Sequence, residues 1–82
     1  MTKTYEEINK YCSDFFQDML VEVKIEDSDV FIVLDSEVYK YYLSNLIYRK
    51  NSVAVGELFS GVINHLSYLY DEYKFMIVVS LD

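Results

Sequence analysis

The fold is decided by residues 21–34, which have the sequence VEVKIEDSDVFIVL. In the first half, Val21, Val23 and Ile25 alternate with charged residues, and a period of two is typical of a strand with one buried face. In the second half, Val30–Leu34 is apolar without interruption, which is typical of a more deeply buried strand. The Asp and Ser residues between the two halves favour a turn. The stretch therefore predicts a β-hairpin with an acidic tip.

Before the hairpin, apolar residues recur at helical spacing and predict a first helix. Thr4 is expected to cap it, with Glu7 three positions further on as the second half of a capping box. The apolar stripe of this helix consists of Ile8, Tyr11, Cys12, Phe15, Phe16 and Met19.

After the hairpin, two further helices and a last strand are predicted. Asp35 or Ser36 can cap the second helix. Asn51 suits its C-terminal end and Ser52 the start of the third helix. Residues 74–81 return to a β-rich pattern. The element order is therefore α-β-β-α-α-β. We expect one α+β domain over residues 1–82, in which an antiparallel hairpin plus the C-terminal strand form a small three-stranded sheet packed against three helices.

Composition restricts the classes of partner. The chain of 82 residues carries 7 basic and 14 acidic side chains, for a net charge of −7. This balance argues against sequence-independent binding of nucleic acid, which needs Lys and Arg at the phosphates, and against binding to anionic membranes. It suits a protein partner with a basic face. Solubility alone explains the same charge equally well.

The single cysteine, Cys12, excludes an internal disulfide and favours a reducing compartment. The first residues contain no apolar stretch of the signal-peptide type, and the apolar runs are too short to cross a bilayer. We therefore expect a cytoplasmic protein, in the host cytoplasm if a phage encodes it.

No recognisable catalytic or cofactor-binding group emerges from the residues, so an enzyme is not expected. One His and one Cys cannot form a structural zinc site, and the two glycines form no phosphate-binding loop. His65 lies at the border of the third helix's apolar stripe and is expected to be packed and hydrogen-bonded. Cys12 is expected to be a small core residue. A solvated turn is a better interpretation of the acidic hairpin tip than a cation site, because the tip lacks the spacing and glycine of a calcium loop.

Asp35 and Ser36 also invite a comparison with acyl carrier proteins, which are small and acidic and modify the Ser of an Asp-Ser-Leu motif. The resemblance ends at these two residues, because Glu37 stands where that motif has Leu. The preceding segment is predicted to be a strand, whereas that family is all-helical. Ser36 is therefore interpreted as a helix cap.

Tyrosines and carboxylates on polar faces are the candidate functional residues. Tyr41 and Tyr48 are predicted on the polar side of the second helix, and Tyr68 on that of the third. Exposed tyrosines are common at recognition surfaces, although in so small a domain they are as readily explained as cover for the core. Glu7 and Asp14 are expected to form a strip with Asp18 on the first helix. Carboxylates on adjacent helical turns lie about 5–6 Å apart, close to the spacing of phosphates.

These features lead to a first hypothesis of function. The chain would be a non-catalytic inhibitor of a nuclease or other nucleic-acid-binding protein, docked on a Lys/Arg-rich groove, with mimicry of nucleic acid as one way of docking. In size, acidity and lack of catalytic residues it resembles phage and mobile-element proteins that block host defence nucleases, including anti-CRISPR proteins. The residues assigned to this surface are Glu7, Asp14, Asp18, Glu26, Asp27, Asp29, Asp35, Glu37, Tyr41, Tyr48, Tyr68, Asp71 and Glu72.

Two alternatives remain open at this point. An immunity protein or antitoxin that neutralises a toxin requires the same acidic surface. A structural or adaptor subunit would act as a homodimer through Tyr41 and Tyr48. Salt separates these classes, because a complex between opposite charges weakens at high ionic strength and an apolar dimer does not. Either a monomer or a homodimer is compatible with the sequence.

Overall fold

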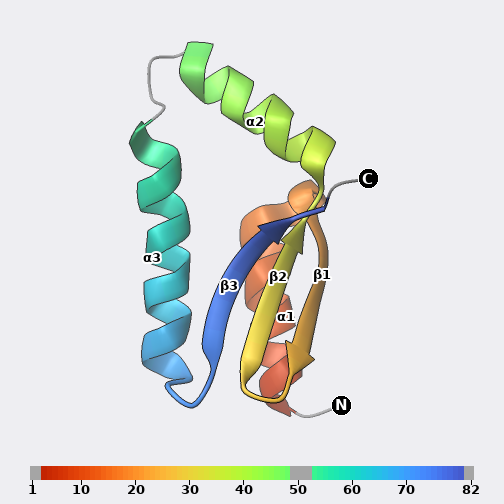
Figure 1. Ribbon diagram of the computed structural model, residues 1–82, viewed down its shortest axis with the longest axis vertical. Helices are drawn as coiled ribbons and strands as arrows, with labels where there is room; N and C mark the ends of the chain where they lie inside the picture. Colours follow the sequence, from red (N-terminus) through yellow and green to blue (C-terminus); the bar gives the residue numbers. More distant parts are fainter. Residues whose placement is uncertain (1–2, 49–52, 81–82) are drawn as a thin grey trace.

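The computed structural model describes residues 3–48 and 53–80, with side chains described outside residues 43–58. The observed element order is the predicted α-β-β-α-α-β, with one additional short 3₁₀ turn, η1 (Figure 1). The elements are α1 (Lys3–Phe16), η1 (Gln17–Met19), β1 (Leu20–Glu26), β2 (Asp29–Leu34), α2 (Ser36–Tyr48), α3 (Val53–Leu69) and β3 (Lys74–Val79).

The three strands form one mixed sheet with the order β1-β2-β3. β1 and β2 are the predicted antiparallel hairpin, joined by a two-residue turn in which Asp27 has φ 55°. Aspartate tolerates this left-handed conformation better than most residues. β3 pairs with β2 in parallel. A parallel pair needs a long crossover connection, and α2 and α3 supply it.

The core lies between one face of the sheet and the two helices α1 and α3 (Figure 1). Every second residue of β2 is fully buried on this face, as the period of two requires. The buried residues are Ile8, Cys12, Phe16, Met19, Val23, Val30, Ile32, Leu34, Val62, Leu66 and Phe75. α2 extends from the end of β2 and contacts η1 and α3. Helices therefore cover one sheet face, and no described element covers the other.

The ends of the helices differ from the predictions. α1 begins at Lys3, so Thr4 lies inside its first turn rather than at the cap. Asp35, and not Ser36, caps α2: its Oδ1 accepts hydrogen bonds from the backbone N–H groups of Glu37 and Val38, at 3.0 Å each. An aspartate just before the first helical residue is well placed for this role. The predicted caps at residues 51 and 52 lie outside the described residues.

Three apolar residues are exposed, although Val21 and Phe15 were predicted to face the core. A register shift between Leu20 and Glu22 turns Val21 outward, so that it is 53% exposed. Leu69 is 52% exposed at the end of α3. Phe15 is 41% exposed near the end of α1, beside the break described below.

Candidate functional site

The single cysteine and the single histidine of the chain lie in different surroundings. Cys12 is fully buried in the core, as predicted. Burial raises the pKa of its thiol to about 11, so the nucleophilic thiolate is scarce at neutral pH. His65 is exposed on α3, and its ring stacks on Tyr11 with a centroid distance of 5.1 Å. His65 was expected to be packed and hydrogen-bonded, but it is exposed, and the contact that the structure describes for it is the stack on Tyr11.

Within the described parts of the chain, no three His, Cys, Asp or Glu side chains are grouped in a way that could hold a metal ion. None of the helices described there combines the length and hydropathy that crossing a bilayer requires.

The fold divides the predicted carboxylates between the two ends of an elongated molecule. The start of α1, the β1–β2 turn and the α3–β3 turn all lie at the lower end in Figure 1. The predicted site carboxylates of these segments define what we call the acidic end: Glu7, Glu26, Asp27, Asp29, Asp71 and Glu72.

Two contacts join the segments of the acidic end. The Tyr70 hydroxyl donates a hydrogen bond of 2.7 Å to Oε2 of Glu7, which lies 63 positions away in the sequence. This hydrogen bond raises the pKa of Tyr70. The backbone N–H of Lys74 donates to the carbonyl oxygen of Ser28 at 2.8 Å, so the two turns are also connected. Charges distant in the sequence are thereby held at one end of the fold.

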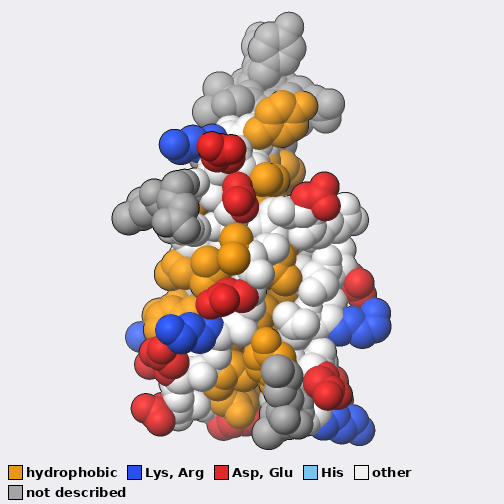
Figure 2. All heavy atoms as spheres, turned by 90° about the vertical axis from the view of Figure 1, so that its right-hand side faces the viewer, with side chains coloured by type: hydrophobic (Ala, Val, Ile, Leu, Met, Phe, Trp, Pro, Cys, Tyr) orange, Lys and Arg blue, Asp and Glu red, His pale blue; other side chains and the backbone are white. Residues whose placement is uncertain are grey.

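The acidic end also contains cations. Lys24 pairs with Glu26 at 2.9 Å, and both side chains are more than half exposed. Lys3 begins α1, and Lys74 lies opposite Asp29 in the β2–β3 register. The carboxylates outnumber these cations. Figure 2, viewed from the right-hand side of Figure 1, shows acidic and basic groups on either side of a band of hydrophobic side chains.

The predicted strip of carboxylates along the first helix does not form. α1 ends at Phe16 because Gln17 adopts φ 51°, and Asp18 therefore lies in η1. Asp14 is on α1 but forms an ion pair with Lys10, with 2.8 Å between Nζ and Oδ2. Glu7 is held by Tyr70 at the other end of the helix.

The remaining candidates lie at the opposite end or beside the acidic end. Asp18, Glu37 and Tyr41 are exposed at the end where α1 stops and α2 begins, together with Asp35, which is used as the helix cap. Tyr41 is 72% exposed, as predicted. Tyr68, which is 86% exposed, lies in the last turn of α3, towards the acidic end. The side chain of Tyr48 is outside the described residues.

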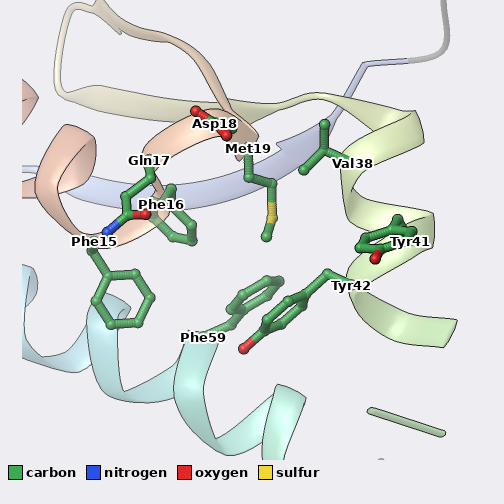
Figure 3. A pocket seen from close by; sticks show the side chains of 9 residues that line it. All are labelled: Phe15, Phe16, Gln17, Asp18, Met19, Val38, Tyr41, Tyr42 and Phe59. Atoms are coloured by element: carbon green, nitrogen blue, oxygen red, sulfur yellow. The ribbon is translucent and has the colours of Figure 1, made fainter. Parts of the chain in front are cut away.

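A pocket that the sequence did not reveal lies at the end where α1 stops. We call it the aromatic pocket, and its volume is about 370 Å³. Figure 3 shows Phe16 and Met19 on one side of it and the rings of Phe15, Phe59 and Tyr42 on another. Its lining residues are Phe15, Phe16, Gln17, Asp18, Met19, Val38, Tyr41, Tyr42 and Phe59.

The lining of the aromatic pocket comes from α1, η1, α2 and α3, which meet only in the folded chain. Phe16 makes edge-to-face contacts with Phe15 and Phe59, at centroid distances of 4.9 and 5.7 Å. These contacts position the rings against one another. The helix break at Gln17 places Met19 in η1 and not in a continuous helical stripe, and nothing in the sequence marks that break, since neither Gly nor Pro is present there.

No protein-family model matches the chain, and neither a curated protein nor a solved structure shows significant similarity to it. The function is therefore argued from the geometry of the acidic end and the aromatic pocket.

Proposed function

We propose that this protein is a non-catalytic inhibitor that binds, through its acidic end, a Lys/Arg-rich nucleic-acid-binding surface of a nuclease or similar protein. Blocking of a defence nuclease by a phage or mobile-element protein belongs to this class. The observation that carries the proposal is the convergence of carboxylates from three separate segments on one end of the fold.

The acidic end is suited to contact a groove lined with cations. Its carboxylates lie on two tight turns and the first part of a helix, so most of them are exposed. The contacts between Tyr70 and Glu7 and between Lys74 and Ser28 reduce the ordering needed on binding. With a net charge of −7, the chain would be steered towards a positive surface, and association would be fast at low salt.

Competition with nucleic acid follows from this arrangement. A groove that neutralises phosphates with Lys and Arg offers the same cations to carboxylates. Occupation of the groove by the acidic end would exclude the nucleic acid, and the inhibitor itself would need no reactive group.

The proposal is tested by capture from a host-cell lysate on the immobilised full chain, followed by elution with duplex DNA or with salt. The informative variant combines Asp71→Lys with Glu72→Lys, in the exposed α3–β3 turn. The matched control combines Glu22→Lys with Glu37→Lys, which makes the same charge change at exposed residues outside the acidic end.

We expect nucleic-acid-binding proteins to be retained at low salt, released by duplex DNA, and lost with the acidic-end variant but not with the control. Equal retention by both variants would contradict the proposal, as would retention that neither salt nor DNA affects. Self-association insensitive to salt would instead favour the homodimeric adaptor.

A further inference from the structure

We propose that the aromatic pocket is a second binding site, separate from the acidic end, which accepts the side chain of an arginine carried by a protein partner. The pocket volume of about 370 Å³ falls within the range of about 300–1,000 Å³ typical of ligand sites. Two of its lining residues belong to the packed core, since Phe16 is 5% and Met19 7% exposed. Phe15 is 41% exposed and Tyr41 72% exposed, so both are available for contact.

The aromatic lining favours a cation with an apolar stem. Five of the lining residues carry aromatic rings, namely Phe15, Phe16, Tyr41, Tyr42 and Phe59. The ring planes of Phe16 and Phe15 are inclined at 75°, and those of Phe16 and Phe59 at 69°. Ring faces therefore turn in different directions around the pocket, and a cation held over such a face is attracted by the ring quadrupole.

Asp18 supplies the complementary charge. Two other carboxylates on the neighbouring helices are already engaged: Asp14 pairs with Lys10, and Asp35 caps α2. Asp18 lines the pocket and forms no ion pair with another described residue, and the described lining contains neither Lys nor Arg. An incoming cation thus meets an exposed carboxylate at the edge of the pocket, while the neighbouring Met19 points in among the rings (Figure 3).

Arginine fits this combination better than lysine does. Its guanidinium is planar, stacks on aromatic faces, is weakly hydrated, and can pair with a carboxylate through two N–H groups. Its methylene stem can lie along the apolar lining. A neutral apolar side chain that covered Asp18 would take its carboxylate out of water without a hydrogen bond or opposite charge in return, which would weaken binding.

The test uses three peptide probes with the full chain: hexa-arginine, hexa-lysine, and hexa-citrulline, in which each guanidinium is replaced by a neutral group of similar shape. Residue-resolved ¹⁵N NMR titration follows the pocket through the amide signals of Gln17, Asp18 and Tyr41. The acidic end is followed separately through Asp71 and Glu72.

The variants form two matched pairs. Asp18→Asn alters the pocket, and Asp71→Asn makes the same change at the acidic end. Tyr41→Ser removes an exposed ring from the pocket rim, and Tyr68→Ser removes an exposed ring remote from it. The exposure of all four side chains keeps the risk of unfolding low, and circular dichroism checks each variant.

We expect hexa-arginine to shift the pocket signals with an affinity about threefold or more above that of hexa-lysine, and hexa-citrulline to leave them in place. Asp18→Asn should weaken the pocket response about two- to fivefold, and Tyr41→Ser should also weaken it, whereas Asp71→Asn and Tyr68→Ser should not. Equal pocket responses to hexa-arginine and hexa-citrulline would overturn the proposal, as would no response or no effect of Asp18→Asn. Concentration-dependent shifts of the same signals without peptide would assign the pocket to a second copy of the chain.

The arginine pocket and the binding role of the acidic end can be refuted independently of each other. The acidic end is expected to respond to hexa-arginine and hexa-lysine alike, because exposed carboxylates attract either cation, and its response is followed by separate signals.

Discussion

Replacing Asp35 with alanine should destabilise the protein measurably, since the Asp35 carboxylate is the N-terminal cap of α2. Its Oδ1 accepts two backbone hydrogen bonds of 3.0 Å, from the N–H groups of Glu37 and Val38. Alanine leaves both N–H groups without this acceptor. The backbone hydrogen bonds of Asp35 itself, to Met19 and from Tyr39, are unaffected by the change.

The magnitude follows from the cap geometry. Loss of an Asp cap costs about 0.5–2 kcal/mol, and two well-formed hydrogen bonds place Asp35→Ala in the upper half, at about 1–2 kcal/mol. A domain of this length has a total stability of about 4–12 kcal/mol at 0.05–0.15 kcal/mol per residue. The melting temperature should fall by about 4–8 °C for each kcal/mol lost. Because Val38, Tyr41 and Tyr42 reach the aromatic pocket from α2, the pocket should loosen as well.

The assay is urea unfolding followed by far-ultraviolet circular dichroism, with stability from linear extrapolation. Asp35→Asn and Asp35→Ser retain a capping oxygen and should recover most of the loss. Asp71→Ala removes an exposed aspartate from a turn and controls for the change in charge. If Asp35→Ala and Asp71→Ala unfold at the same urea concentration, or if Asp35→Asn is as damaging as alanine, the cap does not stabilise α2 as argued.

Three further predictions concern stability. Leu66→Ala empties a site that is 1% exposed and should cost about 2–5 kcal/mol in urea unfolding; a loss below 1 kcal/mol would contradict its central place in the core. Gln17→Val should cost about 1–2 kcal/mol, because a β-branched residue suits φ 51° poorly, while Gln17→Gly should be nearly neutral; equal unfolding midpoints would argue against the left-handed turn. Tyr70→Phe should cost about 0.5 kcal/mol through loss of the exposed hydrogen bond to Glu7. Since that bond raises the pKa of Tyr70, its contribution is complete below the ordinary tyrosine value of 10.0 and is lost as pH rises through the raised value; unfolding curves of both proteins in alkaline buffers should therefore converge.

The helical break at Gln17 explains why the candidate site was only partly predictable. Each of Glu7, Asp14 and Asp18 is acidic in the sequence, but a shared strip required one continuous helix through Asp18. The chain must instead reverse direction after Phe16 to enter β1, and Gln17 takes a positive φ without the Gly or Asn that usually marks such a turn. Phe15, two residues before the break, is partly exposed and lines the pocket.

The sequence by itself determined the element order, the hairpin and its acidic tip, the burial of Cys12 and the exposure of Tyr41 and Tyr68. These depend on local periodicity and turn chemistry, which act over a few residues. Only the tertiary structure decided that β3 pairs in parallel with β2, that Glu7 meets Tyr70, and that aromatic rings from three helices enclose a pocket beside Asp18. Such contacts join residues far apart in the chain, and they depend on how the helices pack against the sheet.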